Sequence, residues 1–142
     1  MLDPQKDYPL SQKHPEWVST PSGIPLNEVS LDRVVSGEID AGDLRITPET
    51  LRRQADIAEA AGQRALAGNL RRAAELTGVP NEKILAVYNA LRPHRATRQE
   101  VEALCTELEQ VYHASETAAF IRSALPLYEE KHLFKRLKQE DK

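Results

Sequence analysis

The sequence has 142 residues, of which 40% are hydrophobic and 5% aromatic, and its formal net charge is −3. This length suits one domain that buries about two-thirds of the surface of its unfolded chain. A single cysteine, Cys105, excludes an internal disulfide, and no apolar run resembles a signal peptide or a membrane-spanning helix. We therefore expect a soluble, intracellular protein with a small aliphatic core.

Positive charge gathers in the middle of the chain. Residues 45–98 contain nine arginines and one lysine against five acidic residues, whereas the rest of the chain is acidic. Such a basic stretch can face a nucleic acid or an acidic surface of a protein partner, or it can be solvated. The pattern alone leaves these alternatives open.

Residues 1–46 predict an irregular N-terminal arm. They include five of the nine prolines, in turn-rich phrases such as DYPL and TPSGIPL, which indicate extended backbone that cannot fold on itself. Isolated apolar residues along the arm, among them Tyr8, Leu10 and Trp17, indicate that it lies across a surface. That surface is either the protein's own helical body or another subunit.

Two helix starts follow along the chain. Residues 27–37 predict a short helix that Ser30 caps. Thr47 and Pro48 predict the start of the first long helix, because threonine can accept amide hydrogen bonds and proline fits the first helical position. An apolar stripe carries this helix through Leu70.

Two glycines fall inside the predicted long helix. Gly62 and Gly68 each cost about 1 kcal/mol there relative to alanine. Because alanines surround both positions, we expect the glycines to allow close packing against another helix.

Residues 69–95 are the most tightly specified stretch. Gly78 is placed to end the first helix in the left-handed conformation, with Pro80 following. A second helix then has one apolar face, and Pro93 ends it. This face consists of Ile84, Leu85, Tyr88 and Leu91. The stretch predicts a helical hairpin with an apolar inside and a basic outside, which suits docking.

The remaining residues predict further helices. Thr97 and Glu100 form the pattern of a capping box, and a helical pattern restarts around Ser115. Pro126 should kink that last helix or break it.

The predicted fold is therefore all-α. Strand signals are nearly absent. We expect a helical hairpin or bundle in residues 47–142, preceded by the irregular, proline-rich arm of residues 1–46.

No catalytic constellation is present in the sequence. The four histidines have no ligand spacing, and Cys105 has no second cysteine with which to hold zinc. No glycine-rich phosphate-binding loop follows a strand pattern. We therefore predict no catalytic, cofactor-binding or metal-binding residue, and expect Cys105 to be a buried apolar side chain.

A series of phrases nevertheless resembles one protein family over roughly residues 7–132. The phrases are DYPL (7–10), TPSGIPL (20–26), VVSGEI (34–39), DLRITPETL (43–51), QADIAE (54–59), NLRRAAEL (69–76), ILAVYNALRP (84–93) and AAFIR (118–122). In this order they resemble the small (gamma) subunit of adenosylcobalamin-dependent glycerol and propanediol dehydratases.

The resemblance implies a non-catalytic subunit of a carbon–oxygen lyase. The holoenzyme would be a dimer of heterotrimers with a large, a medium and a small subunit. Adenosylcobalamin would lie between the large and medium subunits, not on this chain. The adenosyl radical would abstract hydrogen from a vicinal diol, which then loses water to give an aldehyde.

On this interpretation the chain has a structural role against the large subunit. The residues that we expect at the subunit interface are Tyr8, Leu10, Trp17, Arg45, Arg71, Arg72 and Arg92. We expect a bacterial cytoplasmic protein with no nucleic-acid or membrane partner. The DYPL phrase begins at residue 7, without the longer extension of diol-type relatives that enter microcompartments, which favours a glycerol-type enzyme. The alternatives are a helical adaptor and a nucleic-acid-binding domain that uses the arginine-rich middle.

Overall fold

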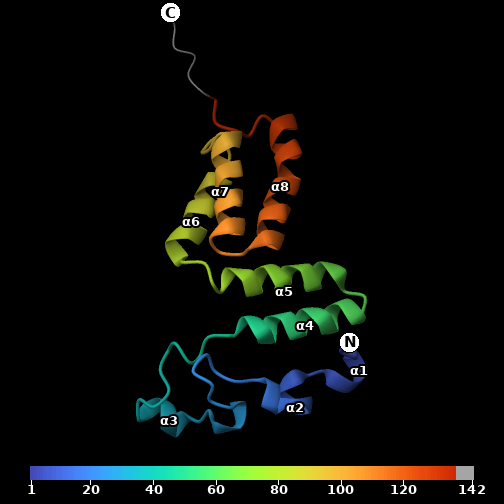
Figure 1. Cartoon of the computed structure of the whole chain (residues 1–142), viewed down its shortest axis with the longest axis vertical. Coiled ribbons are helices and arrows are strands. Elements are labelled where there is room, and N and C mark those ends of the chain that lie inside the picture. The colour runs from blue at the N-terminus through green and yellow to red at the C-terminus, as the bar shows by residue number, and fades with distance from the viewer. Residues whose placement is uncertain (137–142) are drawn as a thin grey trace, which may run out of the picture. The chain divides into compact units, whose positions relative to one another are not determined.

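The structure, a computed structural model, describes residues 1–136 (Figure 1). The described residues form eight α-helices and no β-strand, which confirms the all-α prediction. The chain divides into two compact units, Met1–Ala74 and Glu75–Lys142. The division expected after residue 46 instead marks the change from short helices to long ones.

The first unit begins with short elements. These are α1 (Pro4–Asp7), α2 (Leu10–Lys13), two 3-10 helices (Pro15–Trp17 and Leu26–Glu28) and α3 (Leu31–Val35). The prediction that this backbone cannot fold on itself is wrong. Pro4 and Pro15 each begin a short helix, a position where the missing amide hydrogen of proline costs no hydrogen bond. Farther along, the backbone pairs with itself, since the amide of Leu26 donates to the carbonyl of Val18 at 3.0 Å.

Local caps begin the next helices as predicted. The side chain of Ser30 accepts a hydrogen bond from the amide of Arg33 at the start of α3. The long helix α4 (Pro48–Ala60) has Thr47 as its cap, whose hydroxyl accepts from the amide of Thr50 at 3.3 Å.

The single long helix expected through Leu70 is in fact two helices. After α4, Gly62 adopts a φ of +79°, and the amide of Gln63 donates to the carbonyl of Ala58 at 2.8 Å. This closing turn ends α4, and α5 (Arg64–Leu76) follows. The close packing expected at Gly62 is absent, since no described atom lies within 4 Å of where a Cβ would stand.

The second unit contains α6 (Asn81–Ala90), α7 (Arg98–Gln110) and α8 (Ser115–Glu130), with α7 and α8 side by side (Figure 1). The capping box of Thr97 and Glu100 is present, and α8 continues through Pro126 without a break. The buried core of this unit consists of Val79, Ala96, Val101, Cys105, Leu108, Ala114, Ala118, Ile121 and Leu125. Cys105 is fully buried, as predicted, and burial raises the pKa of its thiol.

Two expectations about the stretch around α6 are wrong. Gly78 is not in the left-handed region; instead the amides of Gly78 and Val79 donate to the carbonyls three residues earlier. The inward side of α6 includes Ile84 and Val87, whereas Leu85 and Tyr88 are 60% and 65% exposed. The apolar pattern of α6 therefore covers two sides of the helix, and only one of them is buried.

Candidate subunit interface

A cluster centred on Trp17 organises the N-terminal segment. The Trp17 ring stacks on the His14 ring, with 3.7 Å between the two centroids. The guanidinium carbon of Arg53 lies 5.3 Å from the centroid of the same Trp17 ring. Arg53 also donates to the carbonyl of Trp17. His14 Nε2 lies 2.8 Å from Asp7 Oδ1 and its Nδ1 lies 3.3 Å from Glu16 Oε1. Trp17 is therefore half-buried by the chain's own side chains.

Charge stabilises this cluster in a defined protonation state. The hydrogen bond to Asp7 is the main reason that the pKa of His14 is raised above 6.5, with Glu16 adding to it. In return, the pKa of Asp7 is lowered, chiefly by the backbone amide of Asp3 and then by His14. Protonated His14 is thus the form that the segment favours.

The other two apolar candidates of the arm differ in exposure. Leu10 is only 5% exposed, so its side chain packs within this unit and offers no surface to another protein. Tyr8 is 63% exposed and lines a groove of about 450 Å³ beside α4 and α5, together with Ile57 and Leu66. Of Tyr8 and Leu10, Tyr8 is therefore the one that is available for contact with another protein.

The arginine candidates of the first unit are partly engaged. Arg71 in α5 pairs with Asp56 and Glu59 of α4, and this pairing is the main cause of the lowered pKa of Glu59. Arg72 donates to the side chain of Asn69 at 2.5 Å. Arg45 is exposed in the turn before α4. The ion pairs of Arg71 therefore hold α5 against α4.

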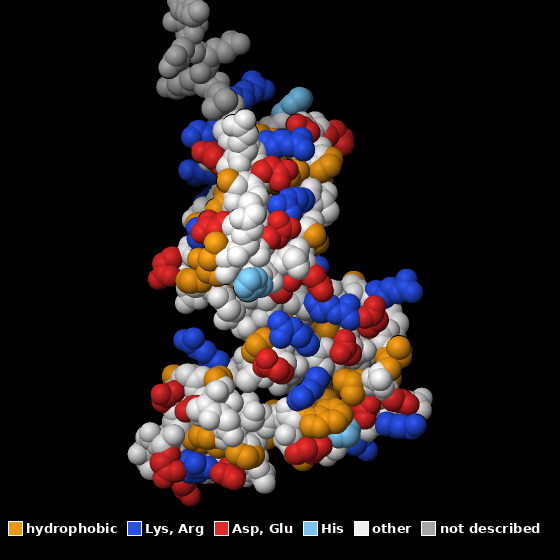
Figure 2. Space-filling view, in the orientation of Figure 1, with side chains coloured by type: hydrophobic (Ala, Val, Ile, Leu, Met, Phe, Trp, Pro, Cys, Tyr) orange, Lys and Arg blue, Asp and Glu red, His pale blue; other side chains and the backbone are white. Residues whose placement is uncertain are grey.

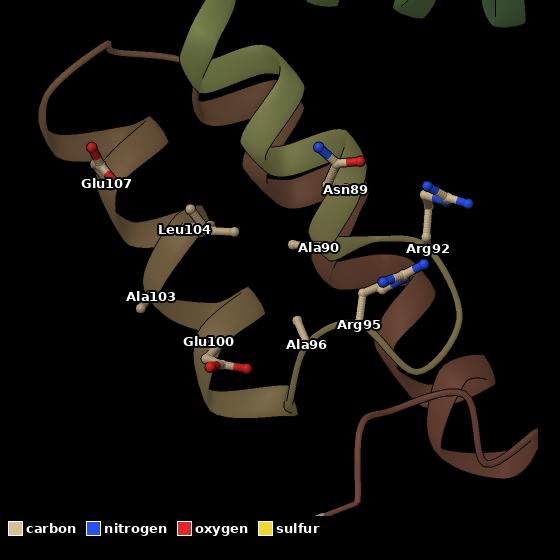
Figure 3. A pocket seen from close by; sticks show the side chains of 9 residues that line it. All are labelled: Asn89, Ala90, Arg92, Arg95, Ala96, Glu100, Ala103, Leu104 and Glu107. Carbon is tan, nitrogen blue, oxygen red and sulfur yellow. The ribbon is translucent and has the colours of Figure 1, made fainter.

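The second unit has its own exposed surface around α6. Leu85 and Tyr88 lie on its outward side, and Arg92 follows at the helix end. Next to them, a groove of about 620 Å³ lies between α6 and α7 (Figure 3). We call it the α6–α7 groove. Its lining residues are Asn89, Ala90, Arg92, Arg95, Ala96, Glu100, Ala103, Leu104 and Glu107.

Arg122 links α8 to α7 through two carboxylates. Its guanidinium pairs with Glu102 at 3.1 Å and with both oxygens of Glu109. The pairing raises the pKa of Arg122 and lowers that of Glu109. Because both acids are fully engaged, we interpret this trio as structural.

Other exposed apolar side chains are scattered over both units. Figure 2 shows hydrophobic side chains among charged side chains of both signs. The sequence pattern did not predict that four of these side chains are exposed, because their spacing resembles that of core positions. They are Leu31, Val35, Phe120 and Leu127. Residues 1–136 include no group of three His, Cys, Asp or Glu side chains that could hold a metal ion. No helix among them is long and apolar enough to cross a membrane.

Comparison with known proteins identifies relatives over nearly the whole chain. A family model described as dehydratase small subunit matches residues 4–135. The chain is 52% identical over 135 residues to the propanediol dehydratase small subunit of Citrobacter freundii, which covers 95% of this chain and 77% of that protein. The corresponding protein of Salmonella typhimurium strain LT2 is also 52% identical, over 95% of this chain and 76% of its own.

Proposed function

Since the chain belongs to the dehydratase small-subunit family, we propose that it serves an adenosylcobalamin-dependent enzyme that dehydrates glycerol or 1,2-propanediol to an aldehyde. The match to the family model over residues 4–135 is the observation that carries this proposal. A small subunit has partner subunits in a dehydratase complex. We propose that these are a large and a medium subunit, in a dimer of heterotrimers.

The described residues do not fit a cobalamin site. Histidine is the side chain here that could ligate cobalt, but His14 is held between two carboxylates and stacked on Trp17. The other three histidines, His94, His113 and His132, lie in separate turns with positive φ. We propose that the partner subunits hold the cofactor and that this chain has a structural role.

The relatives support one of the two substrates. Both matched proteins are named propanediol dehydratase small subunits. That name supports 1,2-propanediol as the substrate of the complex to which this chain belongs. An aldehyde assay with each diol decides between glycerol and 1,2-propanediol. It has to use the assembled enzyme, because the large subunit of such a complex selects the substrate.

The interface proposal keeps most of the residues expected from sequence. We propose that Tyr8, Trp17, Arg45, Arg71, Arg72 and Arg92 face the large subunit. Leu10 is left out because it is buried in its own unit. Tyr8 is the sharpest test position, since its exposed side chain can be changed without opening a core.

Co-purification tests the assembly. When this chain is co-expressed with tagged large and medium subunits, we expect the three to comigrate in size-exclusion chromatography. Tyr8→Ser should reduce the retained small subunit several-fold, whereas the matched change Leu31→Ser, at an exposed residue of the same unit, should leave it unchanged. Migration of the wild-type chain as a separate peak would contradict the proposal.

A further inference from the structure

The α6–α7 groove combines an apolar floor with charged walls. Ala90 points toward Leu104 of α7 with Ala96 beside it (Figure 3), and Ala103 also lines the groove. Small side chains along a floor leave room for side chains from another molecule. The exposed Tyr88 and Leu85, about one and two helical turns before Arg92, add further exposed apolar side chains on α6.

The acidic wall of the groove is already engaged. Glu107 accepts a hydrogen bond from Lys83 at 2.8 Å. Glu100 accepts one from the backbone amide of Thr97 at 2.7 Å, which is the main cause of its lowered pKa. Among the described residues no ion pair joins either carboxylate to Arg92 or Arg95, although the nearby charge of Lys135 also contributes to the lowered pKa of Glu100.

Four cations lie at one end of this groove, and none of them has an ion pair among the residues that the structure describes. They are Arg92, Arg95, Lys135 and Arg136, and we call them the basic end. Backbone hydrogen bonds place their two segments together: the amide of His94 donates to Leu133 at 2.7 Å, and that of Lys135 donates to Ala96 at 2.8 Å.

The other cations of the second unit contrast with the basic end. Within the described part of the chain, Lys83, Arg98, Arg122 and Lys131 each have a carboxylate within 4.0 Å. Within residues 1–136, no carboxylate lies within 4.0 Å of any of the four basic-end side chains. All four are exposed. Within residues 75–136, these four exposed cations without an ion pair make the surface at the basic end mainly positive.

We propose that the α6–α7 groove and the basic end receive an acidic segment of a partner dehydratase subunit, with an apolar side chain on the alanine floor. The segment's carboxylates would pair with Arg92 and Arg95, for which guanidinium geometry is well suited. This inference rests on the proposed function, because it assumes a partner subunit. A nucleic acid fits less well, since the residues that line the groove include no aromatic ring on which a base could stack.

Charge reversal in the assembled complex tests the inference. We would co-express Arg92→Glu/Arg95→Glu with tagged partner subunits and measure the fraction of small subunit retained as salt is raised. We expect at least a tenfold loss of retention. Arg92→Lys/Arg95→Lys should retain most binding, and Arg52→Glu, an exposed arginine in the first unit, should match wild type. Circular dichroism should show equal helix content in all variants.

Each other outcome has a separate meaning. Wild-type chain that fails to co-purify contradicts the proposed function itself. Wild type retained, with the double reversal retained equally, overturns this inference alone. It is also overturned if the reversal abolishes self-association of the purified chain, or binding of a labelled DNA duplex, while co-purification is unchanged. In those cases the surface receives a second copy or a nucleic acid.

Discussion

Single side chains complete structures that begin far away in the sequence, and Glu75 is an example. The helix α8 has Ala114 at its cap position, which has no side-chain acceptor. The carboxylate of Glu75 accepts hydrogen bonds from the amides of Glu116 and Thr117 at 2.9 and 2.8 Å, and from the Thr117 hydroxyl at 2.6 Å. The negative charge of Glu75 near the N-terminus of α8 also interacts favourably with the positive end of the helix dipole.

Removing this distant cap should destabilise the second unit. We expect Glu75→Ala to lower the free energy of unfolding by about 1–2 kcal/mol, as the loss of a helix cap does. Glu130→Ala is a matched control, because that exposed glutamate lies at the other end of α8. Urea unfolding followed by circular dichroism measures both; equal midpoints for the two variants would contradict the capping role.

The Arg122 pairing predicts a dependence of stability on pH. The folded-state pKa of Glu109 is lowered from 4.5, so its contribution is present above pH 4.5 and is lost as the pH falls through the folded pKa. We expect the stability difference between wild type and Arg122→Met to shrink between neutral pH and about pH 3.5, measured by urea unfolding. A difference that stays constant over this range would rule out the ion pair as its source.

At the scale of elements, a glycine decides where α4 ends. Gly62 has a φ of +79°, whereas Gly68 lies inside α5 with helical backbone. From the sequence, both glycines are predicted to lie inside a helix, since alanines surround each of them in the same pattern. The left-handed turn at Gly62 depends on the backbone hydrogen bonds that end α4, and residue spacing does not reveal these bonds. The caps at Ser30, Thr47 and Thr97 were predictable because each lies within four residues of the amide it serves.

The two glycines should respond oppositely to alanine. Gly62→Ala should lower the unfolding free energy by about 1–2 kcal/mol, because an L-residue resists the left-handed conformation. Gly68→Ala should raise it by up to about 1 kcal/mol, since only the end of the flexible Arg72 side chain, 3.4 Å from the new Cβ, must yield. Thermal unfolding compares them; the same direction of change in both would contradict this assignment.

The N-terminal elements should respond to pH through His14. Its pKa is raised from 6.5, so the stabilisation is complete below pH 6.5 and is lost as the pH rises through the folded value. Because His14 stacks on the only tryptophan, the fluorescence of Trp17 should change with a midpoint above pH 6.5. The variant His14→Gln should lack this transition, and His113→Gln should keep it. A wild-type midpoint below pH 6.5 would refute the pairing with Asp7.

At the scale of the whole molecule, the family was readable from ordered phrases such as NLRRAAEL and ILAVYNALRP, and the comparisons confirm it. The surfaces were harder to predict. Leu85 and Tyr88 fit the apolar period of α6 but face outward, because Ile84 and Val87 already fill the inward side. The basic end needs residues 133–136 to lie beside residues 92–96, a long-range pairing that local patterns do not specify.

If this chain serves a diol-dehydrating enzyme as we propose, its complex should need it for catalysis. The most direct measurement is aldehyde formation from 1,2-propanediol and glycerol, with adenosylcobalamin present, by large and medium subunits expressed with and without this chain. We expect diol-dependent aldehyde formation that falls at least tenfold when the chain is omitted and returns when it is co-expressed. Full activity of the two larger subunits without this chain would contradict the proposed function.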